Sequence, residues 1–231
     1  MDTENEQHRT EGRRRWSLRL LVGVAVAGLL VGLAGPVGAN NGRRATQETR
    51  VLEQDESGEI HNSKARLRRR ENKIDVAWRM PTPESGTYDY PTADQVPPGA
   101  PPHPTVEPGT SEVFSLWAFV FNNPDLCSEE CNFDDIGDTP AQGGIFQLDH
   151  TIGDGRTIKM AGKIYVSELA AAGVPLQNPH DAEVHVAMAP HGKALIGADL
   201  TRQFGGAIGG PDQWWPALFF ADCTPSSGSG C

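Results

Sequence analysis

Asp181, Glu183 and His185 have the residue types and the spacing of a metal-binding site. Residues i, i+2 and i+4 of a β-strand lie on one face, and imidazole and carboxylate groups that lie together bind zinc, copper or another divalent ion. His180 and His191 flank this segment in predicted turns. The candidate metal ligands are Asp181, Glu183, His185, His191 and His150. The alternative is that these side chains form the solvated face of a strand, with histidines in turns because turns are polar.

A second acidic group follows the first predicted strand of the domain and offers the oxygen ligands that calcium prefers. Its members are Glu129, Glu130, Asp134, Asp135 and Asp138. Their spacing is not that of an EF-hand calcium loop. The alternative, which we favour, is a polar surface loop held by a disulfide between Cys127 and Cys131.

Four cysteines, at positions 127, 131, 223 and 231, give the even count that is typical of disulfide-bonded proteins from oxidising compartments. The predicted pairs are Cys127 with Cys131 and Cys223 with Cys231, and pairing between the two groups is the second choice. A four-thiolate metal site is the rival interpretation. It has less support, because the C-x3-C and C-x7-C spacings differ from the C-x2-C spacing usual in zinc sites.

Trp214 and Trp215 precede Pro216 in a glycine-rich segment, where they could form a stacking platform for a sugar or a protein surface. The alternative is that they close one end of the core. The chain has no G-x-S-x-G motif, no phosphate loop that ends in Gly-Lys-Ser/Thr and no H-E-x-x-H motif. We therefore predict a protein that is not an enzyme and needs no cofactor, with a protein or enzyme that binds a divalent metal as the alternative.

From Glu112 onwards, apolar runs alternate with turn residues at intervals of about ten, a spacing typical of an all-β sandwich or barrel. The predicted strands are 113–121, 144–152, 156–166, 182–189, 194–204 and 216–221. The second and third form a hairpin around 153–155, where two glycines and an aspartate suit a tight reversal. Because each sheet must cover its apolar face, the predicted fold class is all-β: a single immunoglobulin-like β-sandwich of about six or seven antiparallel strands.

Four segments between residues 143 and 204 follow one another in an order known from a protein family. They are Gly144-Ile145-Phe146-Gln147-Leu148-Asp149, a hairpin to Lys163-Ile164-Tyr165-Val166, Ala182-Glu183-Val184-His185, and Ala194-Leu195-Ile196 after a glycine-bearing turn. This order resembles the chordin-type CHRD domain. The resemblance implies an extracellular immunoglobulin-like sandwich with a binding or unknown role. The family has an Ala-His-Ile-His segment; Glu183 stands at its first histidine, so only His185 carries over.

The first 39 residues have the features of an export signal. Arginines at positions 13, 14, 15 and 19 precede an apolar run at 20–35, and Val37 and Ala39 are the small residues that a signal peptidase reads, which predicts cleavage after Ala39. The arginines resemble a twin-arginine signal, with Ser17 where an aromatic residue is preferred. The alternative is an uncleaved anchor, because the uncharged stretch 20–42 is long enough to span a bilayer. Either outcome predicts a secreted or cell-surface protein.

Residues 40–110 show no sustained periodicity and become proline-rich, which predicts a disordered linker. A short helix over 63–79 and an acidic partner for the basic run 64–70 are the alternatives to a solvated tail. The β-sandwich domain follows at 111–223. Residues 224–231 form a flexible C-terminal tail that ends in Cys231.

The chain has a net charge of −10, and residues 111–231 hold fifteen acidic against five basic side chains. Such a domain offers no cationic footprint for nucleic acid. We expect membrane contact only through an uncleaved N-terminal segment. The expected function is that of an exported, non-catalytic binding or structural module for an unknown protein or glycan at the cell surface.

Overall fold

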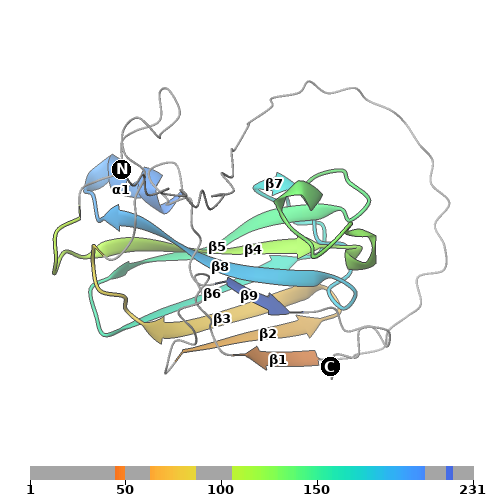
Figure 1. Ribbon diagram of the computed structural model, residues 1–231, viewed down its shortest axis with the longest axis horizontal. Coiled ribbons are helices and arrows are strands. Elements are labelled where there is room, and N and C mark those ends of the chain that lie inside the picture. Colours follow the sequence, from red (N-terminus) through yellow and green to blue (C-terminus); the bar gives the residue numbers. More distant parts are fainter. Residues whose placement is uncertain (1–44, 50–62, 87–105, 206–216, 221–231) are drawn as a thin grey trace, which may run out of the picture. The chain divides into compact units, whose positions relative to one another are not determined.

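The computed structural model describes residues 45–49, 63–86, 106–205 and 217–220 (Figure 1). Within these residues nine strands and one α-helix occur, and the strands form two antiparallel sheets. The all-β prediction is therefore confirmed. The predicted signal segment, Trp214, Trp215, Cys223 and the C-terminal tail lie outside the described residues. None of the helices described is long and apolar enough to cross a membrane.

The first sheet has the strand order β1-β2-β3-β6. Its central hairpin joins β2 (Lys64–Arg70) to β3 (Lys73–Pro81). β1 (Ala45–Thr49) pairs with the outer edge of β2, and β6 (Thr157–Tyr165) pairs with β3 along its whole length. Three strands from the N-terminal half therefore share a sheet with a strand from the middle of the chain.

The prediction of a disordered linker over 40–110 is wrong for β1, β2 and β3, and the alternative of a helix over 63–79 is wrong as well. β3 alternates strictly, because Ile74, Val76, Trp78 and Met80 are buried and the residues between them are not. β2 alternates too, but one of its inward residues is Arg69, which hides the period among charged neighbours. β3 also pairs with β6, which lies far away in the sequence.

The second sheet has the order β7-β5-β4-β8-β9. β4 (Glu112–Phe121) lies in its centre between β5 (Gly143–Gly153) and β8 (Glu183–Lys193), with β7 (Ala172–Gly173) and β9 (Ala217–Phe220) outside them. The predicted strands at 113–121, 144–152, 182–189 and 216–221 are confirmed. Their apolar residues and turn boundaries were sufficient to locate them.

The predicted reversal at 153–155 is present, but the two strands that it joins belong to different sheets. β5 pairs with β4, whereas β6 pairs with β3. Gly162 lies where β6 approaches β5 most closely, since a Cβ atom there would lie 2.6 Å from Leu148 Cβ and 2.8 Å from the Leu148 carbonyl oxygen. The absence of a side chain at Gly162 lets β5 cross directly over β6.

Apolar side chains of both sheets belong to one buried cluster. Leu67, Val76 and Met160 come from the first sheet, and Leu116 and Val186 come from the second. The other side of β4 is also covered: Phe119 and Phe121 pack with Ala187 and Cys131 in a second cluster. β4 is therefore apolar on both faces, as expected for a strand with cover on both sides.

The segment predicted as a fifth strand at 194–204 is instead the helix α1 (Gly197–Phe204). The buried Gln203 side chain fixes this turn of chain: its Nε2 donates to the carbonyls of His191 (2.8 Å) and Lys193 (2.9 Å), and its Oε1 accepts from Leu195 N (3.1 Å). Ile196, which belongs to the predicted strand, is 88% exposed. The buried polar residue Gln203 therefore helps to hold the helix to the sheet.

Candidate functional site

Glu183 and His185 lie on the same face of β8, as the alternation predicted, and their side chains interact. His185 Nε2 lies 2.5 Å from Glu183 Oε1, and the imidazole packs against the Phe121 ring at a centroid distance of 5.0 Å. Asp181 precedes β8 and accepts a hydrogen bond from the Asn178 side chain instead. Only two of the three expected ligands therefore form a pair.

The other three histidines of the described residues have separate surroundings. His191 Nε2 lies 2.5 Å from Ser115 Oγ, His150 stacks on the Phe204 ring at 4.2 Å, and the backbone N–H of His180 donates to Asn178 Oδ1 at 3.1 Å. In the part of the chain that the structure describes, no group of three or more His, Cys, Asp and Glu side chains could hold a metal ion. The predicted site of Asp181, Glu183, His185, His191 and His150 is therefore not formed by these residues.

The Ser115–His191 pair has the composition of a nucleophile and its base, but its surroundings are those of a structural network. Ser115 is fully buried and His191 is 3% exposed. Trp117 Nε1 donates to the same Ser115 oxygen at 2.6 Å. These contacts satisfy polar groups between β4 and β8, which a buried strand requires. Ser115 and Trp117, within the otherwise apolar run 113–121, are the sequence features that could have indicated this network.

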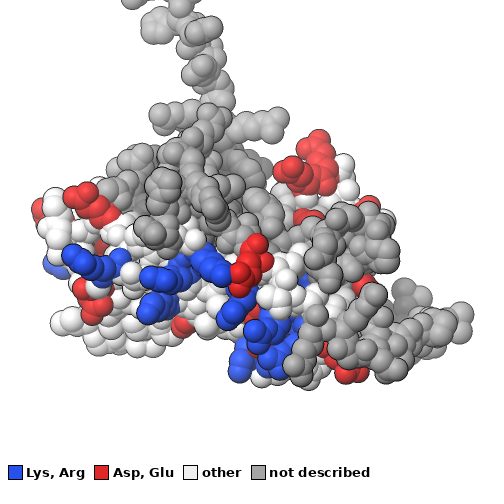
Figure 2. All heavy atoms as spheres, turned by 90° about the horizontal axis from the view of Figure 1, so that it is seen from below, with Lys and Arg blue, Asp and Glu red and all other residues white. Residues whose placement is uncertain are grey.

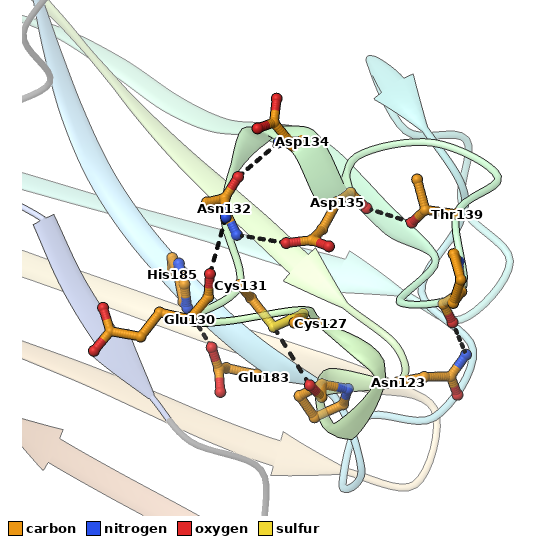
Figure 3. The surroundings of a disulfide bond; sticks show 12 residues. Asn123, Cys127, Glu130, Cys131, Asn132, Asp134, Asp135, Thr139, Glu183 and His185 are labelled. Atoms are coloured by element: carbon orange, nitrogen blue, oxygen red, sulfur yellow. Dashed lines mark hydrogen bonds and ion pairs between the residues drawn. A yellow bond between two sulfur atoms is a disulfide. The ribbon is translucent and has the colours of Figure 1, made fainter. Parts of the chain in front are cut away.

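The loop after β4 is closed by the predicted Cys127–Cys131 disulfide (Figure 3). It contains two short 3-10 helices, η1 (Pro124–Leu126) and η2 (Phe133–Asp135). Asn132 caps η2 by accepting from Asp134 N, and Asp135 accepts from Asn132 N in return. The predicted calcium ligands are not gathered around an ion site in this described loop. Cys223 and Cys231 lie outside the residues that the structure describes.

Removal of this disulfide by the double substitution Cys127→Ser and Cys131→Ser is expected to lower the free energy of unfolding by about 2 kcal/mol, because the bond closes a short loop. Denaturant unfolding of the two proteins measures the difference. Leu126→Ala is the control, since Leu126 is exposed in the same loop and its loss should change stability by less than about 0.5 kcal/mol. An unchanged midpoint for the double variant would contradict a stabilising role for the bond.

The outward face of the first sheet carries a concentration of basic side chains, which we call the basic face. Its members are Lys64, Arg66, Arg68, Arg70, Lys73, Arg79, Lys159 and Lys163. Two carboxylates of the same sheet, Glu48 and Asp75, lie among them, and Asp149 of β5 lies beside them, so the basic face has an excess of five positive charges. Figure 2 shows Lys and Arg side chains gathered on the underside of the domain, where Figure 1 places β1, β2 and β3.

The two carboxylates neutralise only part of this charge. Glu48 lies 2.5 Å from Lys64 Nζ, and Asp75 lies 3.0 Å from Arg70 Nε and 3.1 Å from Lys73 Nζ. The hydrogen bond and charge of Lys64, with the charge of Arg66, hold the pKa of the Glu48 carboxyl below its usual range. Among the described residues, the remaining cations Arg68, Arg79, Lys159 and Lys163 form no ion pair.

A shallow hollow of about 510 Å³ lies within the basic face. The small side chains of Ala77 and Ala161, which are direct partners on β3 and β6, create it. Charged side chains surround the hollow: Lys64, Arg66, Arg79, Lys159 and Asp149. The sequence offered an acidic partner for the basic run 64–70 only as an alternative, and it did not predict the hollow, because the residues of the hollow come from β2, β3, β5 and β6.

The basic face combines an excess of positive charge with a small concavity. Such a surface can bind an anion without any catalytic group. No family model, no curated protein and no solved structure matches the chain in comparisons with each, so the resemblance to the chordin-type domain stays a prediction.

Proposed function

We propose that this chain is an exported, non-catalytic module that binds an anionic partner at the cell surface through the basic face. The observation that carries the proposal is the placement of eight basic side chains on one sheet face in a chain of net charge −10. A cluster of basic side chains has an electrostatic cost, because like charges repel one another. The same cluster concentrates the attraction for an anion on one face.

The scaffold in this proposal is a β-sandwich of immunoglobulin-like architecture. Its support is the single apolar cluster to which both antiparallel sheets contribute. The order β1-β2-β3-β6 is not that of an immunoglobulin constant domain, so the likeness concerns the two packed sheets rather than the path of the chain. One face of each sheet is used for the core, which leaves the basic face available for a partner.

The location in this proposal depends on the N-terminal sequence. The arginines at positions 13–19, the apolar run at 20–35 and the small residues before Asn40 support export. The Cys127–Cys131 disulfide is consistent with an oxidising compartment.

Retention of the full chain on a strong cation-exchange resin at pH 7 tests the binding role. A protein of net charge −10 should flow through, but we expect retention through the basic face. Substitution of Arg68, Arg79 and Lys159 by glutamine should shift elution to clearly lower salt, because these cations form no ion pair within the described residues.

The control is a triple glutamine variant of Arg156, Lys193 and Arg202, which removes the same charge from exposed positions outside the basic face. It should elute with the unmodified protein. Flow-through of the unmodified protein, or an equal shift in both triple variants, would contradict the proposal.

A further inference from the structure

We infer that the ligand of the basic face is an acidic polysaccharide, whose uronate residues dock in the hollow between β3 and β6. This inference depends on the proposed function, because it names the chemistry of the anion that the face binds. Three features of the hollow carry it: the row of cations at one end, the apolar floor, and the single carboxylate at the rim.

The row of cations runs directly across three strands. Lys64 on β2 is the register partner of Arg79 on β3, and Arg79 is the register partner of Lys159 on β6. Side chains at such positions lie about 5 Å apart at Cβ, and like charges placed there are destabilising. Within this row Glu48 offsets the charge of Lys64 alone, and its other partner, Arg66 at 3.9 Å, belongs to the next row. An anionic ligand at this position would relieve the repulsion between Arg79 and Lys159.

The other two charged rows share one carboxylate. Arg68 is opposite Asp75, and Asp75 is opposite Lys163, so that row alternates in sign. Arg70 and Lys73 are opposite each other, and both also lie beside Asp75. In the row that borders the hollow, neither Arg79 nor Lys159 has an acidic register partner or an ion pair among the described residues, and Ala77 and Ala161 follow on the same two strands.

The hollow has the form that a sugar ring requires. Its lining is mainly apolar in area, and the outward residues Ala77 and Ala161 contribute to it. One face of a pyranose ring consists of C–H groups and would contact this floor. Arg66 and Arg79 at the margin present planar guanidinium groups, which bind a carboxylate by two parallel hydrogen bonds.

The carboxylate of Asp149 favours a polysaccharide over a polymer of phosphates as the ligand. Its carboxylate borders the hollow and is held in place by the backbone N–H groups of His150 (2.9 Å) and Ala161 (2.8 Å). A carboxylate repels the phosphates of nucleic acid or polyphosphate, but it accepts hydrogen bonds from sugar hydroxyls. An acidic polysaccharide has both the anions for the cations and the hydroxyls for Asp149.

Two other polyanionic surfaces fit the basic face less well. Single-stranded nucleic acid binds by stacking its bases on exposed aromatic rings, whereas Trp78, which contributes to the hollow, is 2% exposed and the ring of Tyr165 lies under Lys73. Anionic membranes favour basic surfaces that also present apolar anchors. Among the described residues, Tyr165 is the large hydrophobic side chain that is exposed on β6, and Lys73 lies over its ring.

Calorimetric titration of the full chain with an oligomer of six galacturonate residues tests the inference. The matched probes are the methyl ester of the oligomer, polyphosphate, single-stranded DNA and phosphatidylglycerol vesicles. We expect saturable binding of the acid oligomer and at least tenfold weaker binding of the ester. Equal or tighter binding of polyphosphate, DNA or vesicles would overturn the inference.

Ala161→Leu tests the docking position, because it fills the hollow from an exposed strand position without removing a charge. It should weaken binding of the galacturonate oligomer by about tenfold and leave retention on the cation-exchange resin unchanged. Ala77→Leu should act in the same way from the partner strand. Full affinity in both variants would exclude docking in the hollow.

The two levels of the proposal fail in different ways. Retention on the resin through the basic face, without binding of the galacturonate oligomer, would refute the acidic polysaccharide and leave the anion-binding role in place. Loss of retention as well would refute both.

Discussion

Replacement of Arg69 by alanine is expected to lower the free energy of unfolding by about 3–5 kcal/mol. Arg69 lies on β2 and points into the protein, where its exposed fraction is 0%. Nη1 donates to the carbonyls of Pro179 (2.6 Å) and Ala182 (2.7 Å), and Nε donates to Gln47 Oε1 (3.0 Å). Each buried carbonyl that loses its donor costs about 1–3 kcal/mol, and the missing side chain also leaves a cavity.

The loss of stability is expected to be large because the hydrogen bonds of Arg69 connect the two sheets. Pro179 and Ala182 immediately precede β8 of the second sheet, whereas Arg69 and Gln47 belong to the first sheet. One guanidinium group therefore links β1, β2 and the entry to β8. A lysine has one donor group in place of the planar fork, so Arg69→Lys should recover only part of the loss.

Arg68→Ala is the matched control, because it removes the adjacent arginine from the outward face of the same strand. Its effect on stability should be within about 0.5 kcal/mol, as for most surface substitutions. Urea unfolding followed by circular dichroism and by tryptophan fluorescence gives both values. Equal losses for Arg68→Ala and Arg69→Ala would contradict the structural role given to Arg69.

Arg69 also explains why the first sheet could not be predicted from sequence. A buried strand is recognised by apolar residues at alternate positions, and β2 offers Ala65 and Leu67 followed by an inward arginine. In a run of basic residues, nothing local distinguishes the buried Arg69 from its exposed neighbours. Two of the three partners that make its burial favourable, Pro179 and Ala182, lie more than 100 residues away.

β4 and β8 could be predicted because their signals are local. The run at 113–121 is apolar at both alternating sets, and the structure covers both faces of β4. Glu183 and His185 were correctly placed on one face of β8, opposite Val184 and Val186. The alternation of apolar and polar residues shows toward which face of a strand each side chain points, but not which residues of other segments lie beside it. It therefore could not exclude a metal site that the described residues do not form.

The candidate binding site required the register of strands as well as their periods. Lys64 and Arg79 are 15 residues apart in the sequence, and Arg79 and Lys159 are 80 apart. They lie in one row because β3 pairs with β2 on one side and with β6 on the other. The net charge of −10 pointed away from an anionic partner. Net charge is a sum over all surfaces, so it does not show how charge is distributed. The acidic loop at 129–138 follows β4 of the second sheet, whereas the basic face lies on the first sheet.

Gly162→Val is expected to lower the free energy of unfolding by about 3 kcal/mol or more. Gly162 lies between the buried residues Met160 and Ile164 in the period of β6, so a side chain there would point toward β5. Its Cβ would lie 2.6 Å from Leu148 Cβ, 2.8 Å from Leu148 O and 2.9 Å from Leu148 Cα. Two of these three atoms belong to the backbone, so the strain cannot be relieved by a change of rotamer.

The control for this substitution is Ala161→Val on the adjacent, outward position of β6. A β-branched residue suits an exposed strand position, and this variant should unfold at nearly the same denaturant concentration as the unmodified protein. The two neighbouring substitutions should therefore separate the two uses of β6: Gly162→Val disturbs the crossing of β5 over β6, whereas Ala161→Val alters the floor of the hollow. Normal stability of Gly162→Val would show that β5 does not cross at Gly162, and the arrangement of the two sheets would have to be revised.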